Sequence, residues 1–149
     1  MQIDAFLADS VVQADGKLFV LGAGWDQLSS SGFPARHPRL ALGVIVTVPY
    51  LSADADHELR VRLEDADGAV LPIGGHVLPS GQRDTRPRLI RAKLPGARTD
   101  DRGAGDERTI TLAMNFDGLI FDAPGRYRFV LELDGASQKR MVFRVVESA

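Results

Sequence analysis

The chain has 149 residues, of which 44% are hydrophobic and 26% are charged, and its formal net charge is −2. This balance excludes a disordered or membrane-embedded chain, and it gives no general attraction for nucleic acid or anionic lipid. Because the sequence contains no cysteine, it also excludes disulfides, thiolate nucleophiles and cysteine-ligated zinc. A chain of this length is expected to form one domain, residues 1–149, with a self-sufficient core.

The N-terminus carries no sign of an export signal. Asp4 and Asp9 interrupt its apolar run, where a secretory signal would be basic. The most apolar stretch, residues 40–48, is far shorter than the roughly 20 residues of a membrane helix. We therefore expect a cytoplasmic protein with no membrane partner.

The first part of the chain predicts a β-hairpin followed by a loop. Residues 5–13 and 17–21 are expected to pair around the turn-forming dipeptide Asp15-Gly16. Residues 22–38 are rich in glycine and serine and contain prolines, so they are expected to form a loop that crosses to the next strand.

The middle of the chain predicts a central strand and a second hairpin. Residues 39–48 are apolar enough to lie in the middle of a sheet, and Pro49 ends this strand. Residues 57–65 alternate between apolar and charged side chains and turn into residues 69–73. Beyond these, further strands are expected at 88–94 and 109–116, with a mobile loop near 96–107.

Residues 121–146 predict one long antiparallel hairpin with a buried face and a solvated face. Its apolar side chains recur at a period of two and are expected to share a core with those of residues 57–65. This expected core consists of Leu59, Val61, Leu63, Tyr127, Phe129, Leu131, Leu133, Met141, Phe143 and Val145.

The turn Pro124-Gly125 lies two residues before Tyr127, as in the tyrosine corner of immunoglobulin-like sandwiches. In that motif, a buried phenol binds the backbone upstream of its strand, which gives Tyr127 a structural role. Short strands with turn signals every 8 to 12 residues, and no helical period of useful length, predict an all-β fold. We expect an antiparallel immunoglobulin-like β-sandwich of about seven to nine strands.

A search for nucleotide and metal sites finds only weak matches. Gly22-Ala-Gly24 resembles the start of a dinucleotide fingerprint, but Gln27 stands where the third glycine is required. Four aspartates could offer oxygen ligands to calcium, but their spacing is that of ordinary hairpin turns. These four are Asp54, Asp56, Asp65 and Asp67. We therefore expect no cofactor and no metal.

The chain also lacks a catalytic motif, so no catalytic residue is assigned. The three histidines, His37, His57 and His76, have no ligand spacing and are expected to be solvated, and no serine lies in a nucleophile elbow. The basic run 83–98 contains no aromatic residue for base stacking, and acidic residues follow it, which indicates a solvated edge and no nucleic-acid partner.

Trp25 is the single tryptophan, and two interpretations of it remain open. It is either a buried anchor that holds the crossing loop against the sandwich, or an exposed centre for contacts or sugar stacking. Together with Leu28, Phe33 and Leu78, apolar residues in loops, it forms the predicted interaction surface.

Several segments together resemble a family of small proteins of unknown function from GC-rich Gram-positive bacteria, and the match spans nearly the whole chain. These segments are Leu7-Ala-Asp9, Gly16-Lys-Leu18, Gly22-Ala-Gly-Trp-Asp26, Leu40-Ala-Leu42 and Pro124-Gly-Arg-Tyr-Arg-Phe129. The family tends to have glycine where this chain has Ala23, and its counterpart of residues 75–106 is shorter and variable. The resemblance implies a β-sandwich and transfers no catalytic residue.

Because no catalytic, cofactor or metal site is assigned, the sequence favours a non-enzymatic interaction or assembly module with an unknown protein partner. A rigid sandwich offers edges and loop ends to other chains. A homo-oligomer that pairs identical strand edges is the simplest form. Two alternatives stay open. One is a structural component of a phage-like or secretion particle, and the other is a small-molecule or glycan-binding sandwich centred on Trp25.

Overall fold

The computed structural model describes residues 1–73, 78–96 and 105–148, and these are nearly all in β-strands. In the described part of the chain, the single helical element is a short 3-10 turn, η1 (Tyr50–Ser52). The strands are β1 (Gln2–Ala8), β2 (Ser10–Ala14), β3 (Lys17–Leu21), β4 (Gln27–Ser30), β5 (Ala35–Val48), β6 (His57–Asp65), β7 (Ile90–Leu94), β8 (Arg108–Phe121), β9 (Gly125–Leu133) and β10 (Ala136–Glu147).

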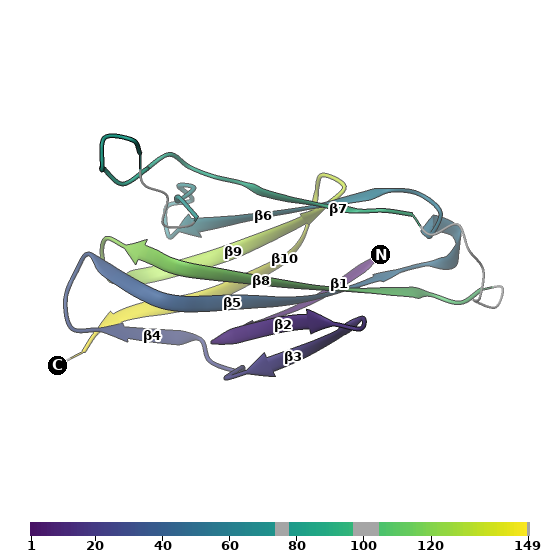
Figure 1. The fold of residues 1–149 in the computed structure, drawn as a ribbon, viewed down its shortest axis with the longest axis horizontal. Coiled ribbons are helices and arrows are strands. Elements are labelled where there is room, and N and C mark those ends of the chain that lie inside the picture. Colours follow the sequence, from purple (N-terminus) through teal and green to yellow (C-terminus); the bar gives the residue numbers. More distant parts are fainter. Residues whose placement is uncertain (74–77, 97–104, 149) are drawn as a thin grey trace.

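The strands form two main sheets and one separate hairpin. One sheet has the order β1-β5-β8 and is antiparallel, and the other has the order β4-β10-β9-β6-β7. The third is the two-stranded sheet β2-β3, which lies along the lower edge of the molecule in Figure 1, away from β6 and β7. The all-β fold of packed antiparallel sheets is therefore confirmed, whereas the immunoglobulin-like arrangement remains a prediction.

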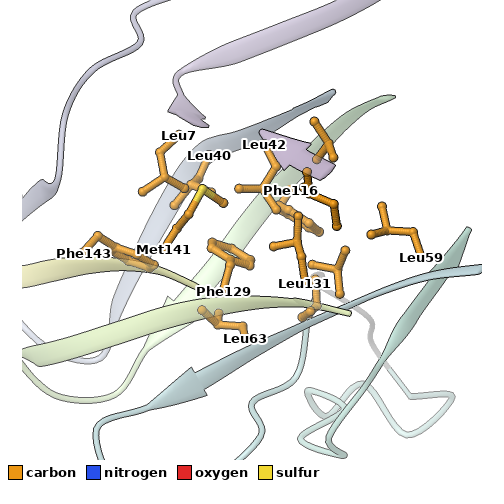
Figure 2. Close-up of a cluster of buried hydrophobic side chains, with 14 of the residues drawn as sticks. Leu7, Leu40, Leu42, Leu59, Leu63, Phe116, Phe129, Leu131, Met141 and Phe143 are labelled. Carbon is orange, nitrogen blue, oxygen red and sulfur yellow. The ribbon is translucent and has the colours of Figure 1, made fainter. Parts of the chain in front are cut away.

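The core lies between the two main sheets and takes side chains from both. Figure 2 shows Leu40 and Leu42 of β5 approaching Phe129, Leu131 and other side chains of the five-stranded sheet. All ten residues of the predicted core are at most 9% exposed, so the register expected from the period of two is confirmed. The side chains between them point away from the core and form the outer face of the five-stranded sheet.

The N-terminal segment differs from the prediction. Residues 5–13 were expected to form one strand, but the chain bends at Asp9, whose N–H bonds the carbonyls of Leu21 and Gly22 at 3.1 Å. Residues before the bend belong to β1, which pairs with β5, and residues after it form β2, which pairs with β3. A period-of-two pattern continues across such a bend, so the sequence alone does not reveal the change of sheet.

The predicted crossing loop 22–38 is also partly wrong. It contains β4, which pairs in parallel with the last residues of β10, and its final residues begin β5 at Ala35 rather than at residue 39. The sequence Gln27-Leu-Ser-Ser30 has no strong strand preference, so its pairing comes from tertiary contact.

The tyrosine corner is present. The Tyr127 hydroxyl donates to the Ala123 carbonyl at 2.5 Å, and its ring packs edge-on against Phe121. Burial is the main cause that raises the pKa of Tyr127.

The expected hairpin turn is present too, because Asp15 and Gly16 have φ angles of 52° and 69°, as a two-residue turn requires. The predicted mobile loop near 96–107 falls largely on residues outside the described part.

Candidate functional site

The structure places three of the four predicted surface residues against the core. Trp25, Leu28 and Phe33 are all half-buried and pack on the central cluster. Trp25 meets Phe143 edge-on with ring centroids 6.3 Å apart, so its indole acts as an anchor for the segment before β4. Leu78 is half-buried in a turn between β6 and β7, where its N–H bonds the Gln82 carbonyl at 2.7 Å.

A larger exposed apolar surface lies on the β2-β3 hairpin. Val12 and Phe19 face each other across the hairpin and are each 57% exposed, and Leu21 is 71% exposed. These three side chains share the outer face of the hairpin, because residues two apart point the same way and Val12 lies opposite Phe19. We call Val12, Phe19 and Leu21 the hairpin patch.

The opposite face of the hairpin holds it on the three-stranded sheet. Val11 is 1% exposed and packs with Ala8 and Ala41, while Leu18 and Ala113 contact the same small cluster. Alanines at these positions leave room for a second layer to approach closely. The hairpin therefore forms an extra layer whose outer side carries the hairpin patch.

A side-chain amide fixes this layer in place. The Asn115 amide of β8 donates to the Val11 carbonyl at 2.8 Å, and its oxygen accepts from the Val11 N–H at 3.1 Å. Asn115 is the single asparagine of the chain. Because both polar groups of Val11 point at Asn115, they are not used between β2 and β3. Val11 and its partner Val20 therefore form a non-hydrogen-bonded pair.

Alternate residues of a strand direct their backbone N–H and C=O groups to opposite edges. The N–H and C=O groups of Val20 and Leu18 therefore point to the edge of β3 that faces away from β2. Among the described residues, no strand pairs with this edge of β3. Figure 1 shows β3 as the outermost strand on that side of the molecule. An unpaired edge beside exposed apolar side chains is a template for strand addition.

The sequence indicates the hairpin patch through an uninterrupted apolar run, which differs from the alternation of apolar and polar residues used above to assign strand faces. Residues 18–21 are apolar without interruption, so a strand formed there has apolar side chains on both faces. One face is covered by the three-stranded sheet, and the other is exposed.

His57 is not the solvated histidine that we expected. Its Nδ1 lies 2.6 Å from Asp134 Oδ2 and its Nε2 lies 2.8 Å from the Ser52 carbonyl oxygen, and its side chain is 9% exposed. Because the carbonyl only accepts and the carboxylate accepts when ionised, both ring nitrogens donate in the imidazolium form. The hydrogen bond to Ser52 and the Asp134 carboxylate raise the pKa of His57, while burial opposes them. The ring joins η1 to the turn between β9 and β10.

Charged side chains cover the outer face of the five-stranded sheet. Glu64 is buried there and accepts from Arg62 Nε at 2.6 Å and from Arg128 Nε at 2.7 Å, and Arg62 also bonds Glu132. The hydrogen bond from Arg62 is the largest cause that lowers the pKa of Glu64. These partners satisfy a carboxylate that would otherwise be costly to bury, so this cluster is structural.

A second satisfied carboxylate lies in the segment before β7. Asp84 is 3% exposed and accepts from Arg86 Nε at 2.9 Å and from Arg88 at 2.6 Å. The Arg86 guanidinium is the main cause that holds the pKa of Asp84 far below its usual range. A carboxylate held in this way is a poor general base, because it stays ionised and its oxygens already have donors.

The described residues hold no group of three or more histidine, cysteine, aspartate or glutamate side chains placed to bind a metal ion. His37 is half-buried within β5, where its register partner is Leu119, and His76 lies outside the described residues. Within the part of the chain described, no helix is long and apolar enough to cross a membrane.

A comparison with protein families identifies the chain. The family of unknown function DUF6941 matches residues 3–146. The chain belongs to this family. The resemblance seen in the sequence, to a family of unknown function, is thereby confirmed; membership gives no activity, and a comparison with curated proteins found no match.

Similar solved structures include a β-glucosidase from Listeria innocua, alone and in complex with isofagomine. The two are 10% and 11% identical, with TM-scores of 0.39 and 0.40, and 97% of this chain is covered in each. The chain spans only 16% of the length of those chains. Likeness at this level carries no argument about activity.

Proposed function

We propose that this protein is a non-enzymatic interaction module that assembles with a second copy of itself through the free edge of β3. The single observation that supports this proposal is the hairpin patch beside that edge: Phe19 and Leu21 are 57% and 71% exposed on β3, whose edge away from β2 pairs with no other described strand. Large apolar side chains grouped on one surface are typical of interfaces.

A symmetric pairing fits the residues of β3. In an antiparallel pair centred on Phe19, the outward backbone groups of Leu18 in one copy meet those of Val20 in the other. Phe19 then lies beside its own counterpart, and Lys17 lies beside Leu21, so no like charges are brought together. The result is one continuous four-stranded sheet across the two copies.

Light scattering across a concentration series tests the proposal. We expect a mass that rises to twice that of the 16.2 kDa chain and then stays constant. Val20→Pro removes an outward N–H from the edge while leaving the bonds inside the hairpin in place, and Phe19→Glu places two carboxylates side by side. Both variants should remain monomeric, whereas the control Leu51→Glu, at a side chain 95% exposed in η1, should dimerise normally.

Three results would overturn this geometry. A strict monomer at every concentration would exclude the pairing. A mass that continues to rise beyond two copies would favour a component of a larger particle. Equal loss of association in Leu51→Glu would show that the contact does not depend on β3.

A further inference from the structure

We infer that the outer face of the five-stranded sheet binds an acidic protein segment. The face is basic although the chain as a whole has a net charge of −2. Each of β6, β7, β9 and β10 contributes two arginine or lysine side chains to this face. The acidic side chains at outward positions of the same strands are Glu58, Glu64 and Glu132. The positive charges are thus concentrated on one side of the molecule.

The two halves of this face differ. On β6 and the adjoining part of β9, arginines are neutralised by glutamates, as in the Arg62–Glu64 and Arg128–Glu64 pairs. On the other half, none of the ion pairs among the described residues includes Arg126, Arg140 or Arg144. We call this half, Arg126, Arg140, Val142 and Arg144, the arginine face.

Two arginines of this face are placed directly opposite each other. Arg126 of β9 and Arg144 of β10 are register partners, and both side chains are exposed. Like charges directly across a sheet destabilise it, because side chains at such positions lie close together. A negatively charged partner between them would remove this repulsion.

Val142 distinguishes a protein partner from a nucleic acid. It lies between Arg140 and Arg144 on β10, opposite Arg128, and is 53% exposed. An apolar side chain surrounded by arginines matches the centre and rim of a protein interface. The outward positions of β6, β7, β9 and β10 hold no aromatic residue among those described, so base stacking has no platform.

The surface is also hollowed on both sides of Arg126. One hollow of about 300 Å³ is lined by Arg126, Arg128 and Val142, and another of about 340 Å³ is lined by Arg126 and Arg144, with Glu147 at its border. Asp65 borders the first, but its carboxylate accepts from the backbone N–H groups of its own turn. Carboxylates of a partner could enter both hollows and accept from the arginines in bidentate geometry.

Fluorescence anisotropy tests this inference with a labelled eight-residue peptide of six glutamates and two leucines. Controls are the same peptide with glutamine for glutamate and a labelled dT oligonucleotide of 20 bases. We expect the acidic peptide to bind, with affinity falling as salt is raised. Arg126→Glu/Arg144→Glu should weaken binding by about tenfold or more, whereas Arg36→Glu/Arg39→Glu, with the same change of net charge at exposed positions of β5, should weaken it less than about threefold.

A second measurement tests the repulsion itself. Arg144→Glu places a carboxylate opposite Arg126, so the melting temperature should rise by about 1 to 4 °C. A melting temperature that is unchanged or lower would show that the two arginines do not repel each other, and the inference would lose a main support. Equal loss of binding in both double variants, no binding of the acidic peptide, or stronger binding of the oligonucleotide would each overturn the inference.

Discussion

The attachment of the β2-β3 layer by one side chain leads to a quantitative prediction. Asn115 forms two hydrogen bonds with the backbone of Val11, at 2.8 and 3.1 Å. A neutral hydrogen bond contributes roughly 0.5–1.5 kcal/mol, and a polar group left without a partner costs somewhat more. Because this site is only partly buried, water compensates in part. Asn115→Ala should lower the free energy of unfolding by about 1–2 kcal/mol.

Urea denaturation measures this change, with Asp117→Ala as the control. Asp117 lies two residues further along the same face of β8, and its pair with Arg39, at 2.7 Å, is exposed on both sides. Removing such a pair costs at most about 1 kcal/mol. In addition, the Val11 amide should exchange faster in Asn115→Ala, since the loss is local to the hairpin. Equal destabilisation by the two variants, with unchanged exchange at Val11, would refute the role of Asn115.

Three further predictions concern other parts of the fold. Trp25→Ala should lower the free energy of unfolding, measured by urea denaturation, by about 2 kcal/mol. This is less than the roughly 3–5 kcal/mol for a fully buried aromatic residue, because Trp25 is half-buried. An unchanged free energy of unfolding would mean that the indole does not anchor the segment before β4. The pKa of His57 is raised in the folded protein, so the stabilisation by its charged form is complete below pH 6.5 and is lost as pH rises through the raised value. The melting temperature should therefore fall over that pH range, and it should depend less on pH in His57→Gln. Gly43→Ala should destabilise by about 1–3 kcal/mol, because an added Cβ would lie 2.1 Å from the Phe6 ring, and an unchanged melt would show that the ring moves freely.

The sequence predicted the three adjacent strands β10, β9 and β6 of the five-stranded sheet well for a physical reason. In β6, β9 and β10, apolar and charged residues alternate regularly, and a one-residue shift would expose every apolar side chain of the strand. The burial of Leu63, Phe129 and Phe143 is the direct consequence. The same alternation contained the arginine face, because the residues between buried ones must point outward.

The first 38 residues were less predictable, because their arrangement depends on contacts between distant segments. The bend at Asp9 is fixed by carbonyls of residues 21 and 22, and the docking of β2 is fixed by Asn115, which is 104 positions from Val11. No local pattern in a single sequence contains such pairings. The sequence likewise does not show what holds the loop that carries Trp25, since that loop is held by the pairing of β4 with β10.

The two proposed surfaces lie on opposite sides of the core. The hairpin patch belongs to the layer outside the three-stranded sheet, whereas the arginine face is the outer side of the five-stranded sheet. Contact through one surface therefore does not cover the other. A dimer formed through β3 would carry two arginine faces, and a partner with two acidic segments could bind both with a gain from effective concentration. Because the surfaces share no side chain, substitutions in them should have additive effects on a single acidic segment, and non-additive effects only on a partner long enough to reach both copies.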